Sequence, residues 1–209
     1  QRSKNVDFSA EYYTKTAGEW TASWFGRDVK DYISSTRTPI THEIMADLGL
    51  DSSFSNYEVI TSQNLGTAKW QGFEFGMRQR LRDFPFVSQV LHQVEIWANF
   101  TKIYQMEGTF TGGASGALIT GLANTVPKLY NAGISYRSLR GKFFVQLTTN
   151  YQAAKPTADI KATNQLRDQL DRFQFWNVEA SYRLTPSLRL TGTGRNLSSV
   201  RQSTSQVGG

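Results

Sequence analysis

The sequence predicts an all-β fold: an antiparallel transmembrane β-barrel segment with about eight long strands. Three observations support this class: strict alternation of apolar and polar residues, an ordered series of short and long connections, and an aromatic share of 13%. No stretch approaches the roughly 18 uncharged apolar residues of a membrane-spanning helix. The mean hydropathy of -0.44 fits barrel strands, which carry apolar side chains only at every second position.

The first two predicted strands show the alternation most clearly. From 4 to 16, one face carries Val6, Phe8, Ala10 and Tyr12, and the other carries Asp7, Ser9 and Glu11. A turn at 17–19 reverses the chain into a strand that starts with Trp20, Ala22 and Trp24, with a bulge expected within 25–29.

A polar segment at 34–56 predicts a long loop. One extended element, interrupted at Asn64 and Gly66, is expected over 57–82, with Phe73 and Phe75 opposite Glu74. A short turn at 83–85 then leads into another long strand over 86–105.

The second half continues the pattern after a glycine-rich loop at 106–124. Strands over 130–136 and 143–151 form a hairpin around the turn at 140–141. The polar stretch 154–171 reads as a loop that could contain a short helix, and strands over 176–184 and from 188 meet at the turn 185–187.

The order of connections is the most informative feature. Short turns near 17, 84, 140 and 186 alternate with long loops at 34–56, 106–124, 155–171 and from 198 onward. Every short turn therefore falls at one end of the sheet. Outer-membrane barrels have this asymmetry, with short periplasmic turns and long extracellular loops.

Composition argues against several other classes. The 23 Lys and Arg residues against 17 Asp and Glu give a net charge of +6, but they are dispersed, so no nucleic-acid partner is expected. Cysteine is absent, and the only histidines, His42 and His92, lie far apart in the sequence. We expect no metal site, no cofactor and no catalytic residues, because no nucleophile, base and acid pattern is present.

Four segments resemble, in order, the barrel of TonB-dependent receptors. They are VDFSAEYYTKTAGEWTASWFGRDVKDYI, LGTAKWQGFEFGMRQRL, VPKLYNAGISYR and FWNVEASYRLTPSLRLTGTGRNLSS, which together extend over residues 6–199. Each motif is weak alone, but the four in the family's order are specific together.

The resemblance implies a 22-stranded barrel in the outer membrane of a Gram-negative bacterium. Residues 1–209 would form a partial C-terminal barrel domain, with the plug domain and the terminal strand absent. The implied function is TonB-dependent active uptake of a scarce nutrient, such as a ferric siderophore, cobalamin or a saccharide. The implied partners are membrane lipid, the receptor's own plug, TonB with its inner-membrane energising complex, and a small-molecule substrate of unknown identity.

Candidate contacts for plug or substrate follow from the alternation, because the polar face of a barrel strand points into the lumen. The lumen candidates are Glu11, Glu74, Arg78, Arg80, Glu95, Arg137, Glu179, Arg189 and Arg195. The loop candidates, aromatic rings that could stack on a ligand, are Phe54, Tyr57, Tyr104 and Phe110. Charged residues of this kind ordinarily solvate the lumen, and aromatic residues ordinarily lie in the interfacial belt.

Two other functions remain open from the sequence. One is a soluble β-rich domain that binds carbohydrate or mediates adhesion through loop aromatics. The other is a receptor-like barrel that serves as a structural subunit of a larger assembly.

Overall fold

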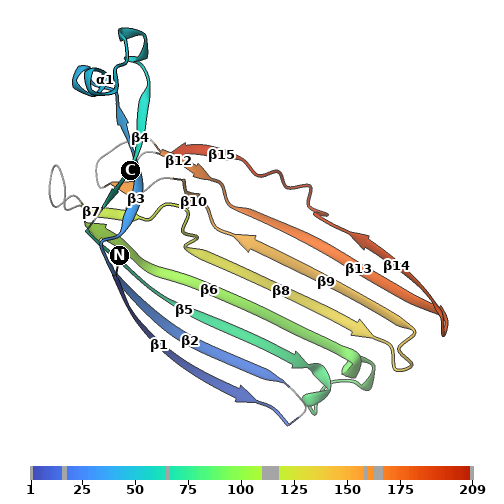
Figure 1. Ribbon diagram of the computed structural model, residues 1–209. Helices are drawn as coiled ribbons and strands as arrows, with labels where there is room; N and C mark the ends of the chain where they lie inside the picture. The colour runs from blue at the N-terminus through green and yellow to red at the C-terminus, as the bar shows by residue number, and fades with distance from the viewer. Residues whose placement is uncertain are drawn as a thin grey trace.

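One antiparallel sheet forms a curved wall in the computed structural model, which describes residues 2–15, 18–64, 66–109, 118–157, 160–161 and 167–207 (Figure 1). The eight long strands pair in chain order. They are β1 (Arg2–Tyr13), β2 (Glu19–Lys30), β5 (Thr67–Arg80), β6 (Val94–Thr109), β8 (Lys128–Arg137), β9 (Phe143–Gln152), β13 (Phe173–Thr185) and β14 (Leu188–Gly194). The predicted fold class, a barrel segment of about eight strands, is confirmed.

Tight turns join the strands at one end of the wall. Between β1 and β2, the Thr14 amide donates to the Gly18 carbonyl oxygen at 2.8 Å, and the Gly18 amide donates to Thr14 Oγ1 at 2.7 Å. Between β8 and β9, Gly141 adopts a φ of 63°, which a side chain would disfavour. The strands therefore reverse within a few residues at this end.

The connection from β5 to β6 is longer than the sequence predicted. Residues 81–93 contain two short 3-10 helices, η2 (Leu81–Asp83) and η3 (Gln89–Gln93), so β6 starts at Val94 and not at residue 86. Pro85 and the nearby polar residues favour turns over a continued ladder, which explains the later start.

The expected loop at 34–56 is instead part of an arm that projects from the opposite end of the wall (Figure 1). Strands β3 (Ile33–Pro39) and β4 (Glu58–Asn64) pair with each other and enclose the helix α1 (His42–Leu48) and a 3-10 turn η1 (Ser52–Phe54). Thr41 Oγ1 accepts the Ile44 amide hydrogen at the start of α1, and Gly49 ends it with a φ of 66°. The single element expected over 57–82 is therefore two strands in two different sheets.

Shorter strands gather at the same end as the arm. β7 (Leu118–Gly121) extends the main sheet beside β6 and also pairs with β11 (Ile160–Lys161). A separate sheet combines β10 (Lys155–Pro156), β12 (Arg167–Leu170) and β15 (Thr204–Val207). In the described part of 154–171 the short elements are strands, so the helix considered there is not found.

Little of the described chain is buried, as expected for a single-layer wall. The buried hydrophobic residues are Val29, Met45, Ala68, Val94 and Leu122. Ala68 and Leu122 form a small cluster under Tyr32, Trp70 and Met106, at the end where the arm and β7 approach the main sheet. Among the described residues, no helix is both long and apolar enough to cross a membrane.

The ladder formed by the eight long strands is regular except at two places. The β1 to β2 register runs without a shift, so the bulge expected within 25–29 is absent. Shifts occur instead between Gln71 and Gly72, opposite β6, and between Arg183 and Thr185, opposite β14. The first shift places Tyr104 as an extra residue on β6.

Candidate functional site

The register sorts the side chains of all eight strands onto two faces. Tyr12, Trp20, Met77, Ala98 and Ala132 pair in sequence across the sheet, and residues two positions away on each strand share their face. This face carries the apolar residues of the alternation, so we call it the outward face. The other face carries most of the charges on these strands, and we call it the inner face.

Aromatic contacts run along the outward face between neighbouring strands. Ring centroids lie 5.9 Å apart for Phe8 and Trp24, 5.7 Å for Phe73 and Phe100, and 4.7 Å for the stacked Tyr130 and Tyr151. With Trp176 these rings form an outer girdle toward the arm. Tyr12, Trp20, Tyr136, Phe143 and Tyr182 form a second girdle toward the tight turns. Two aromatic girdles around an apolar band are characteristic of membrane barrels.

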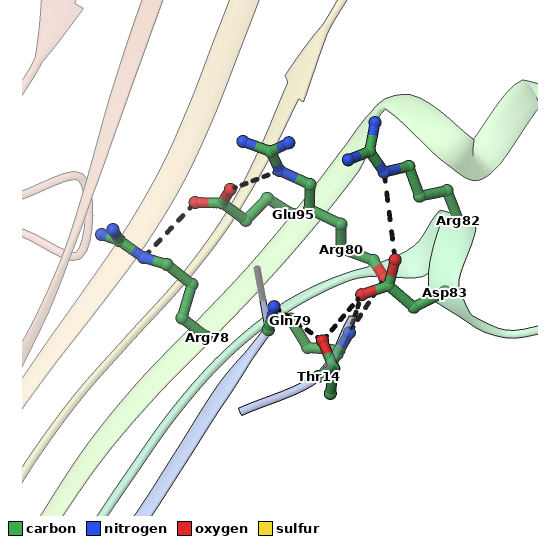
Figure 2. A network of polar contacts seen from close by, with 8 residues as sticks. Thr14, Arg78, Gln79, Arg80, Arg82, Asp83 and Glu95 are labelled. Atoms are coloured by element: carbon green, nitrogen blue, oxygen red, sulfur yellow. Dashed lines mark hydrogen bonds and ion pairs between the residues drawn. The ribbon is translucent and has the colours of Figure 1, made fainter. Parts of the chain in front are cut away.

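Eight of the nine predicted lumen candidates lie on the inner face by this register. The ninth, Arg195, follows the end of β14 and lines a hollow together with Glu179 of that face. The structure brings three of the candidates together near the tight turns (Figure 2). Arg78 Nε lies 3.5 Å from Glu95 Oε1, and Arg80 Nε lies 3.3 Å from Glu95 Oε2. One carboxylate thus holds two guanidinium groups, which leaves this cluster with an excess positive charge.

The remaining candidates are spread along the inner face. Thr101 Oγ1 donates to Glu74 Oε1 at 3.4 Å, and Tyr13 donates its hydroxyl hydrogen to Glu11 Oε2 at 2.5 Å. The guanidinium of Arg137 lies 4.9 Å above the ring of Phe144. These contacts orient single side chains and do not gather them into one site.

An ion pair that the sequence argument did not include joins the first two strands. Arg27 Nη2 lies 2.7 Å from Asp7 Oδ1 on the inner face, and the Arg27 guanidinium also lies 5.5 Å from the Phe25 ring centroid. Asp7 belongs to the polar side of the alternation, but Arg27 falls in the stretch where a bulge was expected. The regular register of β1 and β2 is what brings the two together.

Two shallow hollows on the inner face of this wall contain predicted residues. Arg78 lines one of about 170 Å³ with Glu19, Trp97 and Asn99, and Glu179 and Arg195 line another of about 160 Å³ with Asn177 and Thr193. Sites for small ligands usually enclose at least about 300 Å³. Neither hollow is large enough to be a ligand site by itself, so each is a piece of a wall that another element would have to complete.

Glycines on the inner face make room for large neighbours. A Cβ built on Gly133 would lie 2.5 Å from Trp97 Nε1, and one on Gly72 would lie 2.4 Å from Phe25 Cζ. Because these two positions carry no side chain, the Trp97 and Phe25 rings can pack directly against the backbone and protrude less from the inner face.

The loop candidates have different locations. Phe54 and Tyr57 lie in the arm with ring centroids 5.5 Å apart, and Tyr57 is 61% exposed. Tyr104 is not in a loop: it lies in β6, where its hydroxyl accepts from Trp24 Nε1 at 2.7 Å and donates to Gln71 Oε1 at 3.0 Å. Those partners are on the outward face. Phe110 lies outside the described residues.

A polar latch near the tight turns was missed by the sequence argument. Trp20 Nε1 donates to Gln79 Oε1 at 2.9 Å, and Gln79 Nε2 donates to Asp83 Oδ2, which also accepts from Thr14 Oγ1 at 3.4 Å (Figure 2). Arg82 Nε lies 3.9 Å from Asp83 Oδ1, which is within electrostatic reach but too long for a hydrogen bond. The latch ties the β1 to β2 turn to the start of the β5 to β6 connection.

A second network holds β15 onto the loop at the arm end. Ser203 and Ser205 donate to the two oxygens of Asp171 at 2.7 and 2.5 Å, and Gln206 Nε2 donates to Asp168 Oδ1 at 3.1 Å. The hydrogen bond from Ser205, followed by that from Ser203, holds the pKa of Asp171 below its ordinary value. No group of three metal-ligand side chains occurs among the described residues.

Comparison with known proteins supports the fold described above. Residues 1–197 match the family described as TonB dependent receptor-like, beta-barrel. No curated protein matches the chain.

Several solved structures superpose on most of this chain. The ferric enterobactin receptor PfeA of Pseudomonas aeruginosa is 17% identical with a TM-score of 0.58, and covers 93% of this chain and 26% of its own. The copper transporter OprC is 14% identical with a TM-score of 0.63, at 96% and 26% coverage. The siderophore receptor PirA of Acinetobacter baumannii is 13% identical with a TM-score of 0.54, at 93% and 27% coverage.

The present chain thus spans about a quarter of the length of these receptors. The family match over residues 1–197, the single antiparallel wall and the two-faced register agree with one another. The chain belongs to the family of TonB-dependent receptor β-barrels, proteins of the Gram-negative outer membrane.

Proposed function

We propose that this wall is part of a receptor for the active, TonB-dependent uptake of a scarce nutrient, with a ferric siderophore as the substrate class. The observation that carries the proposal is the family match over a wall with an apolar outward face and a charged inner face. A receptor for iron chelates and a siderophore receptor are among the similar structures, which favours that class over cobalamin or a saccharide.

The inner face suits contact with a plug domain. Its ionic groups are partly exposed: Arg78 and Arg80 keep 63% and 44% of their side-chain surface while sharing Glu95. Exposed ion pairs contribute only about 0 to 1 kcal/mol each. These side chains can therefore exchange partners at low cost, as contacts with a plug that rearranges during transport would require.

The arm suits capture of the substrate outside the membrane. The Phe54 and Tyr57 rings lie together at the end of the molecule opposite the tight turns, where extracellular loops of the family lie. Exposed aromatic rings can stack on the flat groups of a metal chelate. The pair is the part of the described chain that we assign to substrate contact.

The experiment is an uptake assay in the native host. A strain that lacks the gene, complemented with the wild-type receptor, is grown under iron limitation with a panel of ⁵⁵Fe-labelled siderophores, and the same assay is repeated without TonB. Uptake of at least one chelate that requires both proteins is expected. Uptake of copper, cobalamin or a saccharide in place of every ferric chelate would refute the substrate class.

The alternatives are separated by the same strains. TonB-independent growth, together with co-purification of the receptor in a stable stoichiometric assembly, would favour a structural subunit and contradict transport. Phe54→Ala with Tyr57→Ala should raise the KM for uptake with an unchanged maximal rate, whereas a packing defect would lower the amount of receptor in the membrane.

A further inference from the structure

Two lysines lie directly opposite each other on the outward face of adjacent strands. Lys102 of β6 pairs in register with Lys128 of β8. Lys128 Nζ lies 5.9 Å from the Phe100 ring centroid and 5.7 Å from that of Tyr151, so the outer girdle forms the floor beneath this ammonium. The pair therefore marks the boundary between the apolar band and the headgroup region on the arm side.

The surroundings of this pair lack a compensating charge. Among the described residues, neither ammonium lies within 4 Å of a carboxylate, whereas Lys69, farther out on the same face, lies 3.9 Å from Asp28 Oδ2. In register, Lys102 faces Phe73 on its other side. On the β9 side, the Lys128 carbonyl oxygen accepts from the amide of Ala153, a residue without a charged side chain.

Like charges directly opposite each other on a sheet destabilise it. A phosphate between the two ammonium groups would convert this repulsion into two charge-assisted hydrogen bonds. The level of the pair, just beyond the aromatic girdle, is where the headgroups of the leaflet on the arm side lie. A lipid would reach this site with its phosphate at the lysines and its acyl chains along the rings below.

We propose that Lys102 and Lys128 form a binding site for the phosphate of an outer-leaflet glycolipid. The orientation follows from the family, in which the tight turns lie in the periplasm and the long loops outside. Tyr104, whose hydroxyl is held by Trp24 and Gln71, borders the site on the β5 side. The site is on the lipid-facing surface and so is separate from the route of the substrate.

The test measures lipid binding to the complete receptor in detergent. Bisphosphorylated lipid A is titrated against the wild type and against the double variant Lys102→Gln with Lys128→Gln, with bound lipid counted by native mass spectrometry. The matched control is Arg140→Gln with Lys142→Gln, which removes two charges from the β8 to β9 turn at the periplasmic end. At about 1 kcal/mol per basic residue, the site variant should bind about 30-fold more weakly.

The control variant, and a variant with Lys102→Arg and Lys128→Arg, should bind like the wild type. Lipid A without its phosphates should bind the wild type as weakly as bisphosphorylated lipid A binds the site variant. Equal affinity of the site variant and the wild type would overturn the proposal. Displacement of lipid A by inorganic phosphate at the same phosphate concentration would also overturn it, because the site would then hold a free anion and not a lipid.

Discussion

Arginine at position 75 tests the face assignment on which the functional argument rests. Phe75 lies on the outward face of β5, between Ala22 and Phe100 in register, with its ring 5.9 Å from that of Trp20. It lies two positions from Phe73 of the outer girdle, about 7 Å along the strand and about 5 Å in depth for a strand tilted near 45°. On the other side it lies two positions from Met77, the register partner of Trp20 in the second girdle. Position 75 is therefore midway between the two girdles, within the hydrocarbon.

The expected cost of Phe75→Arg is about 2 to 4 kcal/mol of unfolding free energy, the range for a guanidinium placed near the bilayer centre. Glu74→Arg is the neighbouring control on the inner face. It removes the weak hydrogen bond from Thr101, 3.4 Å long and exposed, which is worth about 1 kcal/mol or less. The two variants should thus differ by about 2 kcal/mol, or about 30-fold in the unfolding equilibrium.

The assay is reversible urea unfolding of the complete receptor in lipid vesicles, followed by tryptophan fluorescence. Phe75→Ala is included so that loss of the ring is separated from the added charge. If Phe75→Arg and Glu74→Arg destabilise equally, or if the order is reversed, the outward and inner faces have been exchanged. The assignment of the charged residues to the lumen would then be wrong as well.

Three further perturbations test the local packing and the networks. Gln79→Ala leaves the Trp20 indole without its acceptor and should cost about 1 to 3 kcal/mol in the same unfolding assay; an unchanged midpoint would exclude the latch. Gly133→Ala should cost about 1 to 3 kcal/mol because its Cβ would overlap the neighbouring indole, whereas Gly192→Ala, with open space around it, should cost little, and equal effects would contradict the packing. Because the pKa of Asp171 is lowered in the folded state, the contribution of this carboxylate to stability is complete above the ordinary value of 3.8 and is lost as pH falls through the lowered pKa. Amide exchange of β15, corrected for the intrinsic rate, should therefore increase in the wild type in this acidic range. In Asp171→Asn the exchange should already be increased at neutral pH.

The strand pattern could be predicted because the two-residue period of a β-strand determines both the alternation in the sequence and the face on which each side chain lies. In β13, Trp176, Val178, Ala180 and Tyr182 occupy one face with no interruption, so the face was readable before any partner strand was known. The arm was not readable in this way. Residues 34–56 are polar, and their pairing depends on β3 and β4 meeting across the intervening helix.

The polar latch shows what signal the sequence did carry. Gln79 lies in the same column as Phe73, Phe75 and Met77, yet it is polar and only 2% exposed. A polar residue that interrupts an apolar column at the end of a strand needs a partner, because an unpaired buried amide is costly. The polar residue at this position was a signal that could have indicated the latch, but the identity of its partners depended on turns far apart in the sequence.

The network of Asp171 carried no such signal. Its serine donors are more than thirty residues away: Ser205 lies on β15, a strand of four residues that pairs with β12, and Ser203 just precedes that strand. Ser, Gln and Asp residues are common in loops, so their presence did not distinguish an ordered sheet from an irregular segment. Contacts between distant loops are set by the order of the strands in the wall, which local patterns do not encode.

The interactions that stabilise the wall and the residues available for substrate contact lie on different faces, which bears on how the substrate specificity of such a receptor can change. The ladder runs across all eight strands, and the outward rings occur on all of them except β14; neither depends on the charged side chains of the inner face. The ion pair of Arg27 and Asp7 and the cluster around Glu95 are exposed on that face and contribute little to folding. Substitution on the inner face can therefore alter contacts with plug or substrate while the wall keeps its stability, whereas the outward face is constrained by lipid at nearly every position.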